Sequence, residues 1–385
     1  MSEKFIVLAV SFFLMILYLT KVYGDSPKKY KLSLIGEKNW SDISQLKLPK
    51  KEKKELLYKS NVLYAAHNRY QADHVVAFSS NGKFKVEMRR TDEPLDEDLG
   101  VATIYDSLGN KIWEGTVGFW VYPSNNGDDF VSVGSEASVI RFHKISDTIA
   151  TLDKKTPYVL ASRYGFTFDA KYFVGAGSTL ELLTCEGDVI WRKYTNSPAP
   201  RELAFSYDAS KIALALMPHL LGWQVPQLTD TEDTVSKALP DRSIKNSYLF
   251  ILNRDGEVLH KEILDWPVVH QMTFSPKGDF LAVGGYNHLS IFDVNAKKVI
   301  GKHDQNSLNF SHCSMAFSPS SDLLAIQSYG NLYLLNLKGK ITDYARLTDD
   351  FDTSPVGLTL AFSESGKILL ASTNNKLYAF KIEEK

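Results

Sequence analysis

Several features that mark particular protein classes are scarce or absent in this chain of 385 residues. Cysteine occurs twice, at Cys185 and Cys313, without a CxxC pair, so the sequence predicts two free thiols and no disulfide framework. Neither sign of charge dominates, because 44 Lys and Arg residues are matched by 45 Asp and Glu residues. This balance gives no general attraction to nucleic acid, and we expect no nucleic-acid partner.

The motifs of common enzyme classes are also missing. The chain has no GxSxG, HExxH or GxxxxGK[ST], and no GxGxxG between a strand and a helix. Its acidic clusters, among them Thr348–Asp352, lack the alternating ligands and the glycine bend of a calcium loop. The sequence therefore predicts no catalytic residues, no cofactor and no metal site.

One long apolar run is present, at the N-terminus. Residues Phe5–Leu19 contain a single polar residue and follow Lys4. A membrane-spanning helix needs roughly 20 residues and the apolar part of a signal peptide about 7–15. Residues 1–24 are therefore expected to be either a cleaved signal peptide or a retained membrane anchor. The rest of the chain is expected to be extracytoplasmic (secreted or periplasmic) or tethered to a membrane.

A phrase that begins with an aromatic residue recurs along the rest of the chain. Its clearest copies are FSPKGDFLAVGG, FSPSSDLLAIQS and FSESGKILLAST. The intervals are 39–45 residues, with one of 69. Self-similarity at this period indicates a repeat architecture. The leading aromatics are Phe78, Tyr122, Phe166, Phe205, Phe274, Phe317 and Phe362.

Each repeat is typical of four antiparallel strands, named a to d from first to last. Turn residues follow the aromatic, and hairpins such as Thr103–Gly115 and Leu249–Glu262 complete the unit. Four-stranded units of about 43 residues, repeated seven times, predict an all-β, seven-bladed β-propeller. At these residues the chain resembles the WD40-like and quinoprotein-like propeller superfamily, without the Trp-Asp pair of strict WD40 repeats. Because that superfamily holds enzymes, assembly factors and scaffolds, the resemblance implies a fold and no particular activity.

The sequence predicts how the ring of blades closes. The last repeat ends with the chain after three strands, so a fourth must come from elsewhere. Residues 61–66 precede the first repeat and are expected to supply it, which makes 61–385 the propeller. Residues 25–60 are expected to form a linker with a short helix near Pro49.

Loop length varies on one predicted face, the one that carries the b–c and d–a loops. The largest variation is an insertion at 218–245 in the fourth repeat, between strands b and c. Exposed apolar residues there would anchor a partner, whereas packed ones would only cover the rim or the fourth blade. The residues expected to bind a partner are His219, Leu220, Leu221, Trp223 and, in a d–a passage, Trp266.

A second candidate site comes from aligning the repeats. The residue four positions before each aromatic is expected at the mouth of the central channel on that same face. The polar or reactive residues at this position are His74, Arg201, His270 and Cys313. They are expected to bind water, and otherwise an anion, a partner's side chain or a metal.

These observations favour a non-catalytic scaffold, exported or membrane-tethered, that binds a protein or peptide on the b–c/d–a face. Two other functions stay open. One is a quinoprotein-like propeller enzyme, which would carry a visible chromophore. The other is a sensor of a small molecule or glycan at the channel mouth.

Overall fold

The computed structural model describes twenty-nine strands and, within the described residues, no helix. The all-β prediction is therefore confirmed. The predicted leader at 1–24 and the helix near Pro49 lie outside the described residues. The described residues are 30–39, 74–78, 84–90, 99–106, 110–118, 120–123, 129–133, 139–144, 151–155, 163–166, 171–176, 179–184, 187–195, 200–206, 208, 210–217, 228–230, 246–304, 313–328, 330–347, 360–372 and 376–384.

In the described residues the strands form seven antiparallel sheets, which we number along the chain. Sheet 1 holds β2 (His74–Phe78), β3 (Phe84–Arg90), β4 (Leu99–Asp106) and β5 (Lys111–Gly118). Sheet 2 holds β6 (Trp120–Pro123), β7 (Asp129–Val133), β8 (Val139–Lys144) and β9 (Thr151–Lys155). Sheet 3 holds β10 (Arg163–Phe166), β11 (Tyr172–Ala176), β12 (Thr179–Thr184), β13 (Val189–Thr195) and β16 (Leu228–Thr229). Sheet 4 holds β14 (Pro200–Phe205), β15 (Lys211–Leu216), β17 (Tyr248–Asn253) and β18 (Val258–Ile263).

The last three sheets continue the pattern. Sheet 5 holds β19 (Gln271–Phe274), β20 (Phe280–Gly285), β21 (His288–Asp293) and β22 (Lys298–Asp304). Sheet 6 holds β23 (Cys313–Phe317), β24 (Leu323–Ser328), β25 (Asn331–Asn336) and β26 (Ile341–Arg346). Sheet 7 holds β27 (Leu360–Phe362), β28 (Ile368–Ser372), β29 (Lys376–Glu384) and β1 (Tyr30–Asn39). Each of the seven recurring aromatics lies in the first strand of its sheet.

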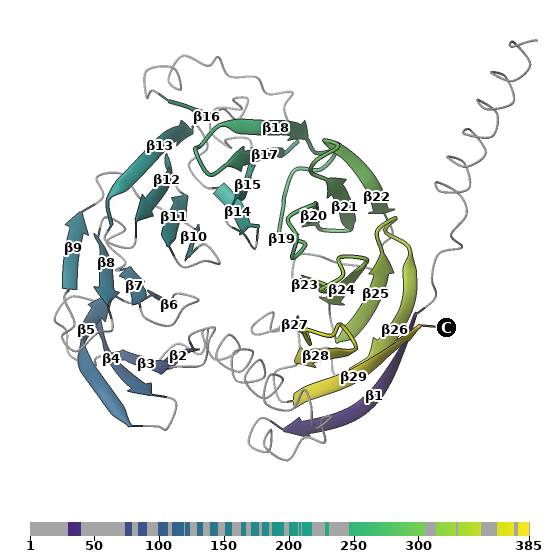
Figure 1. Cartoon of the computed structure of the whole chain (residues 1–385), viewed down its shortest axis with the longest axis horizontal. Coiled ribbons are helices and arrows are strands. Elements are labelled where there is room, and N and C mark those ends of the chain that lie inside the picture. The colour runs from purple at the N-terminus through teal and green to yellow at the C-terminus, as the bar shows by residue number, and fades with distance from the viewer. Residues whose placement is uncertain are drawn as a thin grey trace, which may run out of the picture.

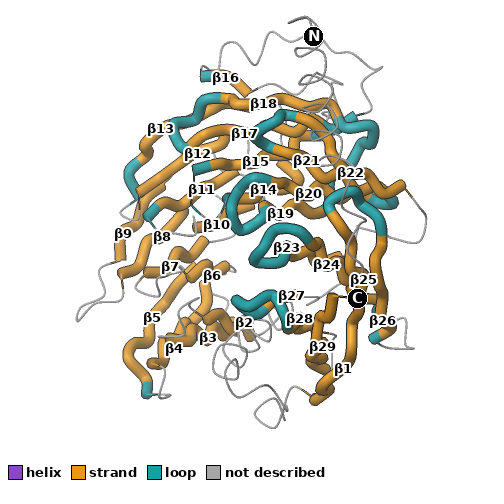
Figure 2. The backbone as a smooth tube through the Cα atoms, turned by 45° about the vertical axis from the view of Figure 1, so that its right-hand side comes forward, coloured by secondary structure: helices purple, strands orange, loops and turns teal. Residues whose placement is uncertain are grey.

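The sheets follow one another around a common centre, each with its first strand innermost (Figure 1). The innermost strands contact one another in the order β2, β6, β10, β14, β19, β23 and β27. A view turned by 45° shows β10, β14, β19 and β23 around the same centre (Figure 2). One end of every sheet therefore carries the a–b and c–d turns, and the other end carries the b–c and d–a connections.

In sheets 4 to 7, where its side chain is described, the recurring aromatic packs its sheet against the one before it. Phe274 lies in one buried cluster with residues of sheet 4, and Phe317 in another with residues of sheet 5. Strand b alternates large and small side chains to match. In β20, Leu281 and Val283 face sheet 4, whereas Ala282 faces sheet 6. Between sheets 4 and 5 the large side chains of β20 meet Ala213 and Ala215, which lets these two sheets approach closely.

The serine that follows the aromatic is also structural. Ser206, Ser275, Ser318 and Ser363 are all at most 1% exposed. The Oγ of each accepts a hydrogen bond of 2.9–3.1 Å from the backbone N–H five residues later. The backbone N–H of each serine in turn donates a hydrogen bond to the carbonyl of that later residue. The repeated Phe-Ser phrase therefore encodes one packed aromatic and one closed a–b turn.

We expect Ser318→Ala to lower the free energy of unfolding by about 1–3 kcal/mol, because it leaves the buried N–H of Leu323 without its Oγ acceptor. The matched control is Ser320→Ala in the same turn, where the side chain is exposed. Urea denaturation followed by tryptophan fluorescence measures both. Equal losses in the two variants would show that the buried serine has no special role.

The strand that completes sheet 7 is β1, which corrects the prediction that residues 61–66 do so. β1 pairs with β29 from Tyr30↔Glu384 to Asn39↔Lys376, and β28 occupies the other edge of β29. Both edges of the last strand are thus taken, and residues 61–66 lie outside the described residues. The predicted linker at 25–60 accordingly contains a ten-residue strand.

β1 also joins sheet 7 to sheet 6. Tyr30 OH donates a hydrogen bond of 2.9 Å to Asp322 in the β23–β24 turn, and Leu32 N–H donates one of 2.7 Å to Asp343. Burial raises the pKa of Asp322, but hydrogen bonds from Ser320, Ser318 and Tyr30 outweigh it and hold that pKa below its usual value. The Asp322 carboxylate therefore favours the folded state when it is ionised.

This linkage makes stability sensitive to acid. Because the folded-state pKa of Asp322 is depressed, its contribution is complete above the ordinary aspartate pKa of about 3.9 and is lost as pH falls below it. We expect Asp322→Asn to be less stable at pH 7 and to lose less stability than wild type between about pH 4 and pH 2. The exposed Asp265 supplies the control Asp265→Asn. Parallel pH curves for wild type and Asp322→Asn would contradict this linkage.

Candidate functional site

The b–c/d–a end of sheet 5 brings together a d–a passage and a tight b–c turn. The passage leads from Leu264 to His270, and the turn joins β20 to β21 through Tyr286 and Asn287. Its described side chains include four rings in two contacting pairs. We call Trp266, His270, Tyr286 and His288 the sheet 5 cluster.

Trp266 is the buried base of this cluster. It is 4% exposed, lies among the core residues shared by sheets 4 and 5, and stacks on His288 with ring centroids 5.3 Å apart. A Cβ on Gly285 would lie closer than 3.0 Å to the Trp266 ring, so the glycine makes room for it. The expectation that Trp266 is an exposed partner anchor is therefore wrong. The Trp266 ring instead packs in the core and stacks on His288.

Tyr286 is the exposed member of the cluster. Its side chain is 51% exposed, and its φ is +23°, which L-residues with large side chains rarely adopt. It stands at the first turn position between the paired residues Gly285 and His288, where a two-residue hairpin favours glycine. Its ring meets the His270 ring edge-on at 4.7 Å. A strained and exposed aromatic at a turn is a recognised marker of a functional position.

Charged groups border the sheet 5 cluster. His288 Nδ1 lies 3.0 Å from Asp304, and Lys302 Nζ lies 3.2 Å from Asp265. All four side chains are more than 40% exposed, so these pairs add little stability. They place both signs of charge next to an aromatic surface, an arrangement that suits hydrogen bonding to a peptide or protein.

Two of the predicted channel-mouth residues, His270 and Cys313, have described side chains. His270 directly precedes β19 and contacts Tyr286, whereas Cys313 packs against the buried cluster between sheets 5 and 6. Burial raises the pKa of the Cys313 thiol, and the Glu202 carboxylate raises it further, so the thiol stays protonated at neutral pH. The expected place of Cys313 at the channel mouth stays a prediction.

The other two channel-mouth residues are placed by their backbone alone. His74 begins β2, and Arg201 lies in β14. Their side chains fall outside the described part of the chain. Within the residues that the structure describes, no group of three His, Cys, Asp or Glu side chains is arranged to hold a metal ion.

The insertion of sheet 4 reaches back to sheet 3. Its described part, β16, pairs with the outer strand β13 through Tyr194↔Thr229 and Thr195↔Leu228, and Asp230 forms an ion pair with Lys193. The predicted partner residues His219, Leu220, Leu221 and Trp223 lie outside the described residues and remain a prediction.

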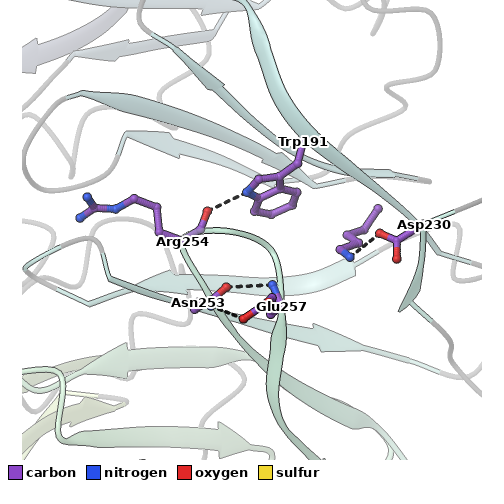
Figure 3. Close-up of polar contacts among 6 residues, drawn as sticks. Trp191, Asp230, Asn253, Arg254 and Glu257 are labelled. Carbon is purple, nitrogen blue, oxygen red and sulfur yellow. Dashed lines mark hydrogen bonds and ion pairs between the residues drawn. The ribbon is translucent and has the colours of Figure 1, made fainter.

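A second bridge joins the same two sheets (Figure 3). Trp191 of β13 donates its Nε1–H to Arg254 O, at 2.7 Å, in the c–d turn of sheet 4. The neighbouring Gly256, with a φ of +82°, lies against the indole ring. The outer edge of sheet 3 is thus covered by two segments of sheet 4.

Comparison with known proteins assigns no family. The chain matches no protein-family model, and a search of curated proteins finds no match either. The candidate site therefore rests on its own geometry. The motif analysis missed Tyr286, although GGYNHL shows an aromatic where a turn usually has Gly or Asn.

Proposed function

We propose that the seven sheets are the blades of one closed seven-bladed propeller, similar to the WD40-like and quinoprotein-like superfamily. We further propose that this propeller is a non-catalytic scaffold, exported or membrane-tethered, that binds a protein or peptide on its b–c/d–a face. The repeated inner strands, the sheet-to-sheet contacts from β2 to β27 and the closing pair β1–β29 support the architecture. The sheet 5 cluster supports the choice of face.

Tyr286 is the observation that carries the binding proposal. A residue kept at an unfavourable φ loses of the order of 1–3 kcal/mol of folding free energy relative to an unstrained one. Because the Tyr286 ring is half exposed, its packing within the protein offsets little of that loss. Tyrosine is among the side chains that most often dominate binding energy when a partner buries them. Next to it, the buried Trp266 stacks on the partly exposed His288 at the start of β21.

The test separates binding from folding at this one position. We expect the free energy of unfolding of Tyr286→Gly to equal or exceed that of the wild type, because glycine accepts a positive φ without strain. The same variant should capture the partner at least tenfold more weakly, since the buried aromatic ring is lost. The partner is first identified by photo-crosslinking from position 286 in cells that make the protein naturally. Binding is then measured with purified components.

Tyr344 provides the matched control. It is 66% exposed on the outer strand β26 of sheet 6, where it stacks on Tyr333 outside the sheet 5 cluster. Tyr344→Gly should leave partner binding unchanged. A Tyr286→Gly variant that loses stability while binding normally would show that Tyr286 is structural, and the proposed face would be wrong.

A further inference from the structure

We propose that a basic hollow between sheets 5 and 6 binds the phosphate group of a small soluble ligand. The hollow has a volume of about 440 Å³, within the range of roughly 300–1,000 Å³ that is usual for small-molecule sites. Tyr286, on which the proposed partner binding depends, is not among the residues that line it. Its walls are the end of β22, with Lys302, His303 and Asp304, and the c–d turn of sheet 6, with Lys338, Gly339 and Lys340.

The two walls of the hollow are held together by close backbone contacts. A Cβ on Gly301 would lie closer than 3.0 Å to Leu337 O, so this position has no room for a side chain. A Cβ on Gly339 would meet the backbone of Lys302 in the same way. His303 adds a hydrogen bond of 3.1 Å from its Nδ1–H to Gly339 O. The turn therefore has a fixed place against β22.

The c–d turn of sheet 6 is also braced from within. Asn336 Oδ1 accepts hydrogen bonds from the backbone N–H groups of Lys338 and Lys340, at 3.0 and 3.1 Å. Gly339 N–H donates to Asn336 O at 2.9 Å. These bonds fix the backbone at both lysines. A ligand that binds there consequently has little backbone freedom to remove, which lowers the entropic cost of binding.

Positive charge predominates around the hollow. Lys302 and Asp304 of β22 are already paired with other side chains of sheet 5. Lys338 and Lys340 are exposed, and no described residue forms an ion pair or hydrogen bond with either ammonium group. Lysine binds phosphate as a point charge. Two unpaired positive charges match a phosphate group, which carries about −1.5 to −2 at neutral pH, better than they match one carboxylate.

His303 gives the hollow a buried polar atom that is not yet satisfied. The residue is 7% exposed, and its Nδ1 carries the proton because Gly339 O can only accept. In the neutral ring Nε2 is then an acceptor, and it has no hydrogen-bond partner among the described residues. Buried polar atoms of this kind are rare, and a bound ion or water is a common partner for them. A phosphate group that keeps one proton can donate to Nε2, whereas an ionised carboxylate cannot.

Contact with Nε2 requires movement of the side chains around it, because this atom is shielded from solvent. Rotamer changes of this size are common when a ligand or partner binds. The lysines on the c–d turn are exposed and can reach an anion without such a change. Binding should therefore depend first on Lys338 and Lys340 and should alter the surroundings of His303.

Titration of the purified full chain with inorganic phosphate tests the site. Calorimetry at about 0.05 M sodium chloride should give a dissociation constant of about 1 mM or lower. Lys338→Gln/Lys340→Gln should weaken binding at least tenfold, because it removes the unpaired charge. It should leave thermal unfolding unchanged, since both side chains are exposed. The matched control Lys298→Gln/Lys367→Gln removes two exposed lysines outside the hollow and should bind phosphate as the wild type does.

Other anions and other sources of phosphate define the ligand class. Acetate at the same ionic strength should bind at least tenfold more weakly than phosphate, and glycerol 3-phosphate at least as tightly. Equal binding of acetate, or equal weakening in both double variants, would show a diffuse attraction to charge and overturn the site. A phosphoserine peptide that binds tenfold more tightly than glycerol 3-phosphate would overturn the assignment to a small ligand.

Histidine NMR gives a readout that diffuse surface charge would not move. In protein with ¹⁵N-labelled histidine rings, saturating phosphate should shift the Nε2 resonance of His303, which is assigned with His303→Gln. The resonance of His260, which is paired with Glu262 on β18, should stay in place. An unchanged His303 resonance at saturation would contradict binding in this hollow.

Exchanging the variants separates this site from the proposed partner face. Tyr286→Gly should bind phosphate as the wild type does. Lys338→Gln/Lys340→Gln should capture the partner normally, because neither lysine belongs to the sheet 5 cluster. Loss of phosphate binding in the wild type would overturn the hollow alone, whereas loss of the photo-crosslink at position 286 would overturn the partner face alone.

Discussion

A chain that lacks residues 30–39 is expected to lose cooperative unfolding. Removing β1 exposes the edge of β29 along nine paired positions and uncovers the cluster that holds Tyr30, Leu32, Phe380 and Ile382. Buried side chains of this size contribute about 1.5–3 kcal/mol each, and each ladder hydrogen bond adds about 1 kcal/mol. The loss is therefore on the order of 5 kcal/mol or more, comparable to the whole stability of many domains.

Calorimetry of the shortened chain measures this loss. A synthetic Tyr30–Asn39 peptide added in trans should restore a cooperative transition where a scrambled peptide does not, which keeps the test decisive if the shortened chain does not fold by itself. Tyr30→Phe gives a graded comparison, because it removes only the hydrogen bond to Asp322 and should cost about 1–2 kcal/mol. An unchanged transition in the deletion would contradict the pairing of β1 with β29.

Gly339→Ala is expected to be the most damaging single substitution at the junction of sheets 5 and 6. Gly339 has a φ of +76°, and an added Cβ would lie closer than 3.0 Å to the backbone of Lys302. Backbone cannot move aside as a flexible side chain can. Strain at a positive φ costs about 1 kcal/mol and overpacking about 1–3 kcal/mol, so we expect a loss of about 2–4 kcal/mol.

Two other glycines separate these causes. Gly301→Ala keeps an ordinary φ but would meet the backbone of Leu337 and Lys338, so it reports the clash alone. Gly366 has a φ of +71°, and an added Cβ would make only an ordinary van der Waals contact of 3.5 Å with Pro319 Cδ, so Gly366→Ala reports the strain alone. Guanidinium denaturation should give the lowest free energy of unfolding for Gly339→Ala and the highest for Gly366→Ala. Equal losses at Gly301 and Gly366 would show that close packing of the two sheets does not matter.

The features that sequence analysis predicted correctly are local ones. The recurring aromatic and serine act within one turn and one neighbouring sheet, as Phe274 and Ser275 show, so their spacing reveals the sheets directly. The closing strand is not local. Tyr30, Leu32 and Leu34 alternate as a strand would, but the residues that pair with them lie at the other end of the chain. The alternation of apolar residues alone did not show which segment, 30–39 or 61–66, supplies the closing strand.

The packing of Cys313 and the burial of Trp266 have geometric causes. Side chains alternate between the two faces of a strand, so an even count back from a packed aromatic leads to the same packed side. Cys313, four residues before Phe317, therefore packs against the core cluster that holds Phe317. Trp266 could not be placed from its type, because tryptophan is common both in cores and at binding surfaces. Its burial depends on the room left by Gly285 in another strand.

The pairing of β1 with β29 has a consequence for biosynthesis. The ion pair between Glu37 and Lys376 joins residues 339 positions apart, so β1 can pair with β29 only after β29 has been translated. At 5–20 residues per second this delay is about 20–70 s. During that interval the apolar side of β1, with Tyr30 and Leu32, has no native partner strand to cover it. We therefore expect the nascent chain to be most prone to aggregation, and most dependent on chaperones, until its final nine-residue strand has left the ribosome.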